Sequence, residues 1–226
     1  RGDLLFFSDE GNLLTHYSQK GIKAYYDPNT ELIYILDISC FLKCYKGSTL
    51  QWSVDLSSDM QQSNIIPLEF IANDDVLYFP GRRFVVWNRN SDIRKTFIVN
   101  DEPQASTICG SYLYTVNYTT CDVYKYNLNV FKKAPDKVLM NDSQYRILRI
   151  SNQCRPSEMK STPDGKYLII GTGPVYGQYG GAVSVIDVKK DKLLYTEYDI
   201  VPRHRVQSVE PSRVNTDCVW LGSMPY

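Results

Sequence analysis

The sequence has no long apolar run and almost no histidine, and both shortages exclude kinds of protein. No stretch of eighteen apolar residues occurs, so no segment is predicted to cross a membrane as a helix. The two histidines, His16 and His204, are too few for a histidine-rich metal site. Neither the Gly-x-Ser-x-Gly elbow of a serine hydrolase nor the Gly-Lys-Ser/Thr of a phosphate-binding loop is present. The sequence therefore predicts no membrane partner, no metal and no cofactor.

An excess of charge is missing as well. The chain has 25 Lys and Arg against 25 Asp and Glu, so its net charge is about zero. A nucleic-acid partner usually requires a basic surface, so none is expected. No signal peptide is visible, but the chain begins at Arg1 rather than at Met, which leaves its localisation open.

Cysteine is sparse and widely spaced. Only Cys40 and Cys44 are close, and a single C-x-x-x-C is a poor zinc pattern. We favour buried free thiols in strands, because Cys is among the most often buried residues. The even total of six leaves disulfides open for a secreted protein.

What the sequence has in quantity is tyrosine, with 18 copies, and short apolar segments of four to eight residues. Tyrosine suits the half-buried faces of strands, and the segments lack the spacing of an amphipathic helix. We therefore expect an all-β chain with few helices. The clearest predicted strands cover residues 4–8, 32–37, 76–79, 84–87, 112–116, 123–126, 167–171 and 182–187.

These strands recur in a fixed order, which we call a, b, c and d. A polar turn is predicted between c and d at residues 9–11, 46–48, 88–90, 127–129 and 189–191, and between a and b at residues 27–29, 73–75, 109–111 and 163–165. The last core residue before each c–d turn is Phe7, Tyr45, Trp87, Tyr126 and Ile186, in steps of 38, 42, 39 and 60 residues. Four strands repeated about every forty residues are typical of β-propeller blades.

The two ends of the chain carry half units. Strands c and d are predicted over residues 4–17, strands a and b over 205–221, and four full blades lie between them. The halves could combine into one blade of a five-bladed ring, or the chain could be an excerpt of a larger, about seven-bladed propeller. We favour the excerpt and expect a single propeller domain over residues 1–226.

The connections of a blade alternate between its two ends, which points to one end as the functional face. The a–b and c–d turns are short. The b–c and d–a connections are richer, and functional residues concentrate on loops held by a rigid scaffold. We predict a ligand-binding site formed by Arg82, Arg155, Tyr176, Tyr179, Arg203 and His204.

Plainer interpretations of these residues stay open. The glycine-rich stretch 171–181 could be a wide bend packed against the next blade, with glycines that allow close backbone approach. Arg203 could lie in a solvated loop, and Arg155 could form a structural salt bridge.

Residues 155–210 carry a resemblance to known proteins. The segments Arg155-Pro-Ser-Glu-Met, Thr162-Pro-Asp-Gly-Lys and Gly171-Thr-Gly-Pro-Val-Tyr-Gly-Gln-Tyr-Gly-Gly-Ala-Val-Ser-Val-Ile-Asp resemble repeats of the WD40-like, quinoprotein-like propeller superfamily. They look most like bacterial members found with carbohydrate-degrading proteins, including propeller polysaccharide lyases. The resemblance implies His, Tyr and Arg around the channel, which His204, the two loop tyrosines and the arginines could supply.

Three functions follow as hypotheses. The first is a module that binds a glycan, acidic or neutral, on the b–c/d–a face. The second is a polysaccharide lyase acting on uronic-acid glycans, in which Arg neutralises the carboxylate and His or Tyr takes the neighbouring proton. The third is a scaffold for a protein partner.

Overall fold

The computed structural model describes residues 4–7, 12–17, 21–27, 30–58, 68–71, 75–79, 81–140, 142–215 and 217–225. Strands dominate these residues. Among them, helix is confined to α1 (Leu128–Lys133) and α2 (Asp142–Tyr145), so the expectation of few helices is confirmed. The chain divides into two compact units, Arg1–Ile66 and Pro67–Tyr226.

The first unit holds two antiparallel sheets. Strands β1 (Leu4–Phe7) and β2 (Leu13–Tyr17) form a two-stranded sheet. A four-stranded sheet follows, in the order β3 (Gly21–Asp27), β4 (Leu32–Asp37), β5 (Phe41–Lys46) and β6 (Thr49–Asp55). Its buried face contains Ile33, Ile35 and Tyr45.

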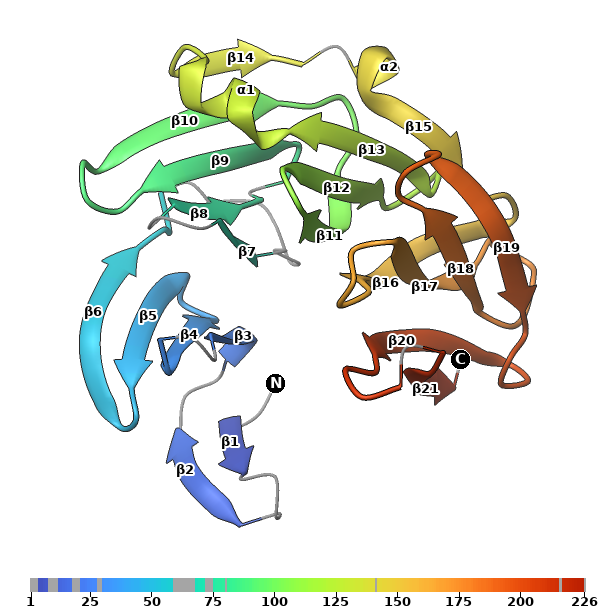
Figure 1. Cartoon of the computed structure of the whole chain (residues 1–226), viewed down its shortest axis with the longest axis horizontal. Helices are drawn as coiled ribbons and strands as arrows, with labels where there is room; N and C mark the ends of the chain where they lie inside the picture. The colour runs from blue at the N-terminus through green and yellow to red at the C-terminus, as the bar shows by residue number, and fades with distance from the viewer. Residues whose placement is uncertain are drawn as a thin grey trace. The chain divides into compact units, whose positions relative to one another are not determined.

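The second unit holds three complete blades and a half blade, coloured green to red in Figure 1. The first blade contains β7 (Leu68–Ile71), β8 (Asp75–Tyr78), β9 (Arg83–Asn88) and β10 (Ile93–Ile98). The next contains β11 (Pro103–Cys109), β12 (Tyr112–Asn117), β13 (Asp122–Asn127) and β15 (Arg146–Arg149). The third contains β16 (Gln153–Ser161), β17 (Tyr167–Pro174), β18 (Ala182–Asp187) and β19 (Lys192–Tyr198). The half blade contains β20 (His204–Pro211) and β21 (Val219–Pro225).

The a, b, c, d order predicted from the sequence is therefore confirmed: in the described residues, four sheets contain a complete antiparallel set of four strands and two sheets are two-stranded. Each predicted strand overlaps an observed one. Turn formers make the short a–b and c–d connections. At Gly165, for example, φ is +68°, a left-handed value that glycine adopts without strain. The fold is all-β and built of β-propeller blades.

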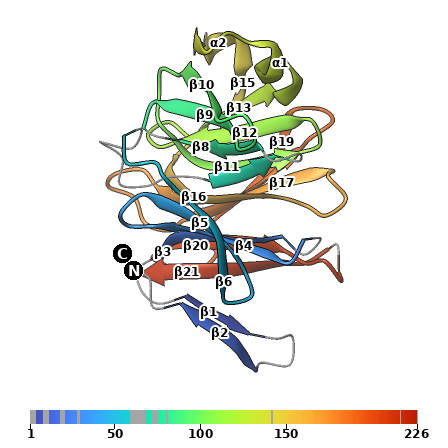
Figure 2. The ribbon, with the colours of Figure 1, turned by 90° about the vertical axis from the view of Figure 1, so that its left-hand side faces the viewer.

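The core of the second unit lies between successive blades. One cluster joins Leu77, Phe84 and Phe97 of the first blade to Leu113 and Tyr126 of the second. Another joins the second blade to the third, and a smaller one joins Ile169, Val183 and Val185 to Val206 and Val209 of the half blade. Figures 1 and 2 show these sheets following one another in chain order. Face-to-face packing of twisted sheets leaves their connections at the two ends.

One predicted turn is wrong. Asn127, Leu128 and Asn129 do not lead directly from c to d. The Asn127 side chain accepts a hydrogen bond from the backbone N–H of Asn129 and caps α1. Residues 128–145 then form an insertion with α1, α2 and β14 (Lys137–Leu139) before the d strand β15 begins. Strand β14 adds to the preceding blade, parallel to β10. The a–b and c–d end is therefore not made of short turns alone.

Other predictions are partly or wholly beyond what the structure describes. The predicted turns at residues 9–11, 27–29 and 73–75 fall wholly or partly outside the described residues. The single domain over 1–226, and the choice between ring and excerpt, stay predictions. All six cysteines are free thiols, four of them buried, while Cys40 is half-buried and Cys218 is exposed.

Candidate functional site

The strand register places the predicted site residues of the third blade at one end. Gln153 of β16 pairs with Pro174 of β17, Thr172 pairs with Ala182 of β18, and Ala182 pairs with Tyr198 of β19. The start of β16, the β17–β18 loop and the end of β19 therefore meet at the same end of the sheet. We call this end of the second unit the rim; it is formed by the b–c and d–a connections around residues 79, 81–82, 99–102, 118–121, 150–155, 175–181 and 199–204.

Arg155 is at the centre of the best-defined group on the rim. It lies at a register shift in β16 and has φ +49°, an uncommon value for a non-glycine residue. Its backbone N–H donates to the carbonyl of Tyr118 at 2.7 Å in the preceding blade, and its guanidinium Cζ lies 4.5 Å from the ring centroid of Tyr176. Hydrogen bonding with Tyr118 and Tyr176 raises the pKa of Arg155 above its ordinary value. We call Tyr118, Arg155 and Tyr176 the Tyr–Arg cluster.

The glycine-rich loop has two parts with different roles. A Cβ at Gly181 would collide with the carbonyl oxygen of Thr172 and lie 2.5 Å from the backbone nitrogen of Val206, and one at Gly180 would collide with Asp199. These two glycines pack the loop against the next connection, so the plainer interpretation of a packed bend is confirmed for this part. The preceding residues instead project Tyr176 and Tyr179, which are 86% and 74% exposed.

Arg203 lies in the connection from β19 to β20, and His204 is the first residue of β20. The backbone N–H of Arg203 donates to Asp199 Oδ1 at 3.0 Å, and the carbonyl of His204 accepts from the Gly181 N–H at 2.6 Å. His204 Nδ1 lies 2.9 Å from the carbonyl oxygen of Pro202. Because a carbonyl oxygen can only accept, this contact requires a proton on Nδ1, which in the neutral ring leaves the lone pair on Nε2. The structure thus joins this connection to the glycine-rich loop.

Arg82 is in the b–c connection of another blade. It is exposed, and its carbonyl accepts from the N–H of Val99 at 3.0 Å. Among the described residues, no hydrogen bond or ion pair connects it with the Tyr–Arg cluster.

Some cations of the second unit are paired with carboxylates at both ends, including Arg149 with Asp122 at 2.7 Å beside the rim connections 118–121 and 150–155. Toward the turn end, ion pairs hold Lys125 to Asp191 at 2.8 Å, Lys166 to Asp164 at 2.9 Å and Lys190 to Asp187 at 3.5 Å. On the rim, Arg82, Arg155 and Arg203 form no ion pair with any carboxylate that the structure describes. The structural salt bridge considered for Arg155 is therefore wrong for this part of the chain. A guanidinium group without a carboxylate partner can receive an anion from outside.

Two residues outside the predicted set belong to the same surface. Tyr118 contributes to the Tyr–Arg cluster and is 40% exposed. Arg205, in β20, directs Nη2 to the sulfur of Met224 at 3.6 Å, while its buried Nε has no hydrogen-bond partner. The run Arg203-His204-Arg205 was the available signal for Arg205. No sequence signal indicated that Tyr118 contacts Arg155, which lies 37 positions later in the chain.

Other kinds of site find no support in the residues described. No group of three or more His, Cys, Asp or Glu there is placed to hold a metal ion. No helix in the same residues is long and apolar enough to cross a membrane.

Comparison with known proteins supports the fold and goes no further. No protein family model and no curated protein sequence matches the chain. Hydrazine synthase from Kuenenia stuttgartiensis is similar in structure, with a TM-score of 0.63 over 85% of this chain and 11% sequence identity. The match covers 52% of that protein, so this chain spans about half its length. In all, 492 chains of known structure match, so the architecture is too widespread to indicate an activity.

Proposed function

We propose that the chain is a binding module for an acidic glycan, held on the rim by the Tyr–Arg cluster and Arg203. The observation that carries this proposal is that Arg82, Arg155 and Arg203, all on the rim, form no ion pair with any carboxylate that the structure describes. Arg149, at the same end, is held by Asp122, and Arg155 has only tyrosine partners, so the charges of these three arginines are not neutralised within the described residues. A guanidinium fork matches carboxylate and sulfate groups, and each charge-assisted hydrogen bond contributes about 1.5–3 kcal/mol.

The tyrosines supply the second half of recognition. The ring of Tyr176 lies on the Arg155 guanidinium, so both side chains lose little conformational freedom when a ligand arrives. Tyr179 is exposed on the same loop and offers an apolar ring face to the C–H face of a sugar. Arg155 would hold the anionic group and the exposed rings the sugar body.

A glycan array probed with the chain tests this proposal. We expect acidic glycans to be retained above neutral ones, and added salt to weaken the retention because the contact is ionic. Arg203→Ala should weaken binding of an acidic glycan by about 1.5–3 kcal/mol and of a neutral one by less. Tyr179→Ala should weaken binding of both.

The matched control is Lys190→Ala, because Lys190 is an exposed cation at the opposite end and is paired with Asp187. Binding of this variant should equal that of the unaltered chain. Equal binding by the Arg203 and Lys190 variants would refute the site and leave the fold untouched.

A lyase is the second candidate, favoured by His204. In the neutral ring, a proton on Nδ1 toward the Pro202 carbonyl would leave Nε2 free to accept a proton, as a general base requires. Elimination from a uronic-acid polysaccharide breaks the C–O bond to the leaving sugar and forms a C=C bond that absorbs ultraviolet light. Rising absorbance with polygalacturonate, abolished in His204→Gln, would establish the enzyme. A flat trace with intact binding would leave the binding module.

A further inference from the structure

Several residues of the rim have a left-handed backbone although none of them is glycine: Cys121, Asn152, Arg155, Asp199 and Arg203. The first three lie where the second blade meets the third. Asparagine adopts this conformation readily, but cysteine and arginine do so rarely, because their Cβ crowds the backbone. Such residues persist only where the surrounding structure fixes them, and they gather at functional sites. The contacts that hold Arg155 in this conformation are therefore of functional interest.

Backbone hydrogen bonds tie Arg155 to the connection that carries Tyr118. The Arg155 N–H donates to the carbonyl of Tyr118 at 2.7 Å. At the other end of the same connection, the carbonyl of Cys121 accepts from the N–H of Ile150 at 3.1 Å. The backbone of Arg155 therefore depends on the shape of residues 118–121.

A polar network beside this connection fixes its shape. Thr120 Oγ1 donates to Asp122 Oδ2 at 2.9 Å, and the Asp122 N–H donates back to Thr120 Oγ1 at 3.3 Å. Arg149 of β15 binds both oxygens of the same carboxylate, Nε to Oδ1 and Nη2 to Oδ2, at 2.7 Å each. Asp122 is only 4% exposed, so water competes little for these bonds. A two-pronged contact of this kind also fixes the direction of the carboxylate.

The network does more than hold two strands together. Strands β13 and β15 already pair through their backbones, with Asp122 opposite Arg149. Thr120 lies in neither strand, and its hydroxyl bonds to the carboxylate that this strand pair keeps in place. The hydroxyl of Thr120 therefore acts on the connection rather than on the sheet.

We propose that Thr120, Asp122 and Arg149 are positioning residues for the rim site. They fix residues 118–121, so that the Tyr118 carbonyl holds Arg155 in the left-handed conformation in which its guanidinium receives the carboxylate of an acidic glycan. The three act through Tyr118 and Arg155 and need no contact with the ligand. A site held ready in this way loses less conformational freedom on binding. The inference rests on the proposed function, because it concerns how that same site is kept in order.

Thr120→Val keeps the shape of the side chain, removes its hydroxyl and so tests this positioning. Without ligand, hydrogen exchange at the Arg155 amide should become about two- to tenfold faster, while exchange at β17 amides stays unchanged because the blade remains folded. The affinity for oligogalacturonate, measured by isothermal titration calorimetry, should fall about two- to tenfold, the range of one lost hydrogen bond. Thr120→Ser restores the hydroxyl and should recover both values.

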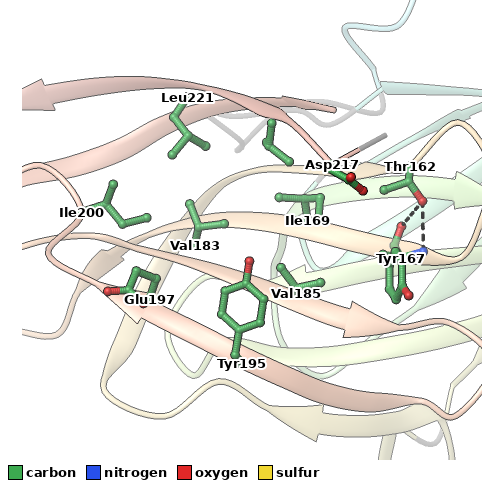
Figure 3. A pocket seen from close by; sticks show the side chains of 11 residues that line it. Thr162, Tyr167, Ile169, Val183, Val185, Tyr195, Glu197, Ile200, Asp217 and Leu221 are labelled. Carbon is green, nitrogen blue, oxygen red and sulfur yellow. Dashed lines mark hydrogen bonds between the residues drawn. The ribbon is translucent and has the colours of Figure 1, made fainter. Parts of the chain in front are cut away.

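Thr162→Val is the matched control, because Thr162 makes the same kind of contact at the turn end. Its Oγ1 donates to Oδ1 of Asp164, two residues later, at 2.7 Å. Figure 3 shows the same oxygen bonded to the backbone of Tyr167, whose N–H it accepts at 3.1 Å. This variant should bind oligogalacturonate as the unaltered chain does and leave exchange at the Arg155 amide unchanged.

Three results would overturn the positioning role alone. They are unchanged exchange at the Arg155 amide in Thr120→Val, faster exchange with unchanged affinity, and an equal loss of affinity in Thr120→Val and Thr162→Val. An unaltered chain that binds no oligogalacturonate would instead refute the proposed function, and with it the role of these residues in binding.

Discussion

Truncation of Phe84 tests the packing between the first two blades of the second unit. Its side chain is fully buried at the start of β9. Its ring centroid lies 4.8 Å from that of Phe97, 5.3 Å from that of Tyr126 in the next blade and 5.1 Å from that of Phe131 in α1. One ring thus contacts two blades and the insertion between strands c and d.

Phe84→Ala should lower the free energy of unfolding by about 4–5 kcal/mol. Large-to-small changes of this kind cost about 3–5 kcal/mol, and the cost rises when the surroundings do not collapse into the cavity. Here the surrounding rings belong to different elements, each held by its own sheet or helix, so collapse is restricted. Each aromatic pair contributes about 0.5–1.5 kcal/mol beyond the contribution of its buried apolar area. The contributions of several pairs that share one ring are not fully additive.

Urea denaturation followed by circular dichroism measures this loss. Phe84→Leu, which retains most of the volume, should lose about 1.5 kcal/mol or less. Ile93→Ala, an exposed apolar position on β10, should change stability by less than about 0.5 kcal/mol. A loss for Phe84→Ala no greater than that for Phe84→Leu would refute the close packing of these rings.

Two further predictions concern the rim loop and the second blade. Gly181→Ala should lower the free energy of unfolding by about 1–3 kcal/mol, because its Cβ would collide with backbone atoms. Gly177→Ala is the control and should cost less, because its Cβ would meet no atom within 4 Å and only the positive φ opposes it. Equal losses for the two variants in urea denaturation would contradict this. Burial by itself raises the pKa of Asp122, but hydrogen bonds from Arg149 and Thr120, with the charges of Arg149 and Arg146, outweigh it and hold that pKa below its ordinary value. The stabilisation by the Asp122 carboxylate is therefore present above about pH 4 and is lost as the pH falls through the lowered pKa. Asp122→Asn should have a lower free energy of unfolding at pH 7 and should lose less of it on acidification. Parallel plots of the free energy of unfolding against pH for the two proteins would show that this carboxylate does not contribute.

The blade order was predictable because local chemistry and the repeat agreed. Gly165 and Gly110 occupy left-handed positions that the a–b turns require, and alternating apolar residues mark the strands on either side. The error at Asn127 has the same origin, since asparagine suits both a turn and a helix N-cap. Only the packing of Phe131 against Phe84 and Phe97 distinguishes the two, and that contact is long-range.

The end of the blades on which the candidate site residues lie was predictable from the sequence, but the contacts among their side chains were not. The alternation of connections assigns Arg155, Tyr176 and Arg203 to one end without any knowledge of distance. The contact of Arg155 with Tyr118 depends on a register shift and a positive φ, at a position where no glycine indicates either. The lack of a carboxylate partner for Arg155 and Arg203 also needs coordinates, because Glu158 and Asp199 lie close to them in the sequence.

The most direct test of the rim compares two double variants in binding to oligogalacturonate by isothermal titration calorimetry. One removes two rim cations, Arg155→Ala with Arg203→Ala; the other removes two paired cations from the opposite end, Lys166→Ala with Lys190→Ala. Both lower the net charge by two, so a loss of binding confined to the first variant cannot come from net charge alone. The rim account predicts that the first variant loses most of its binding and the second binds as the unaltered chain does. Equal loss in both variants, or no loss in the first, would contradict it.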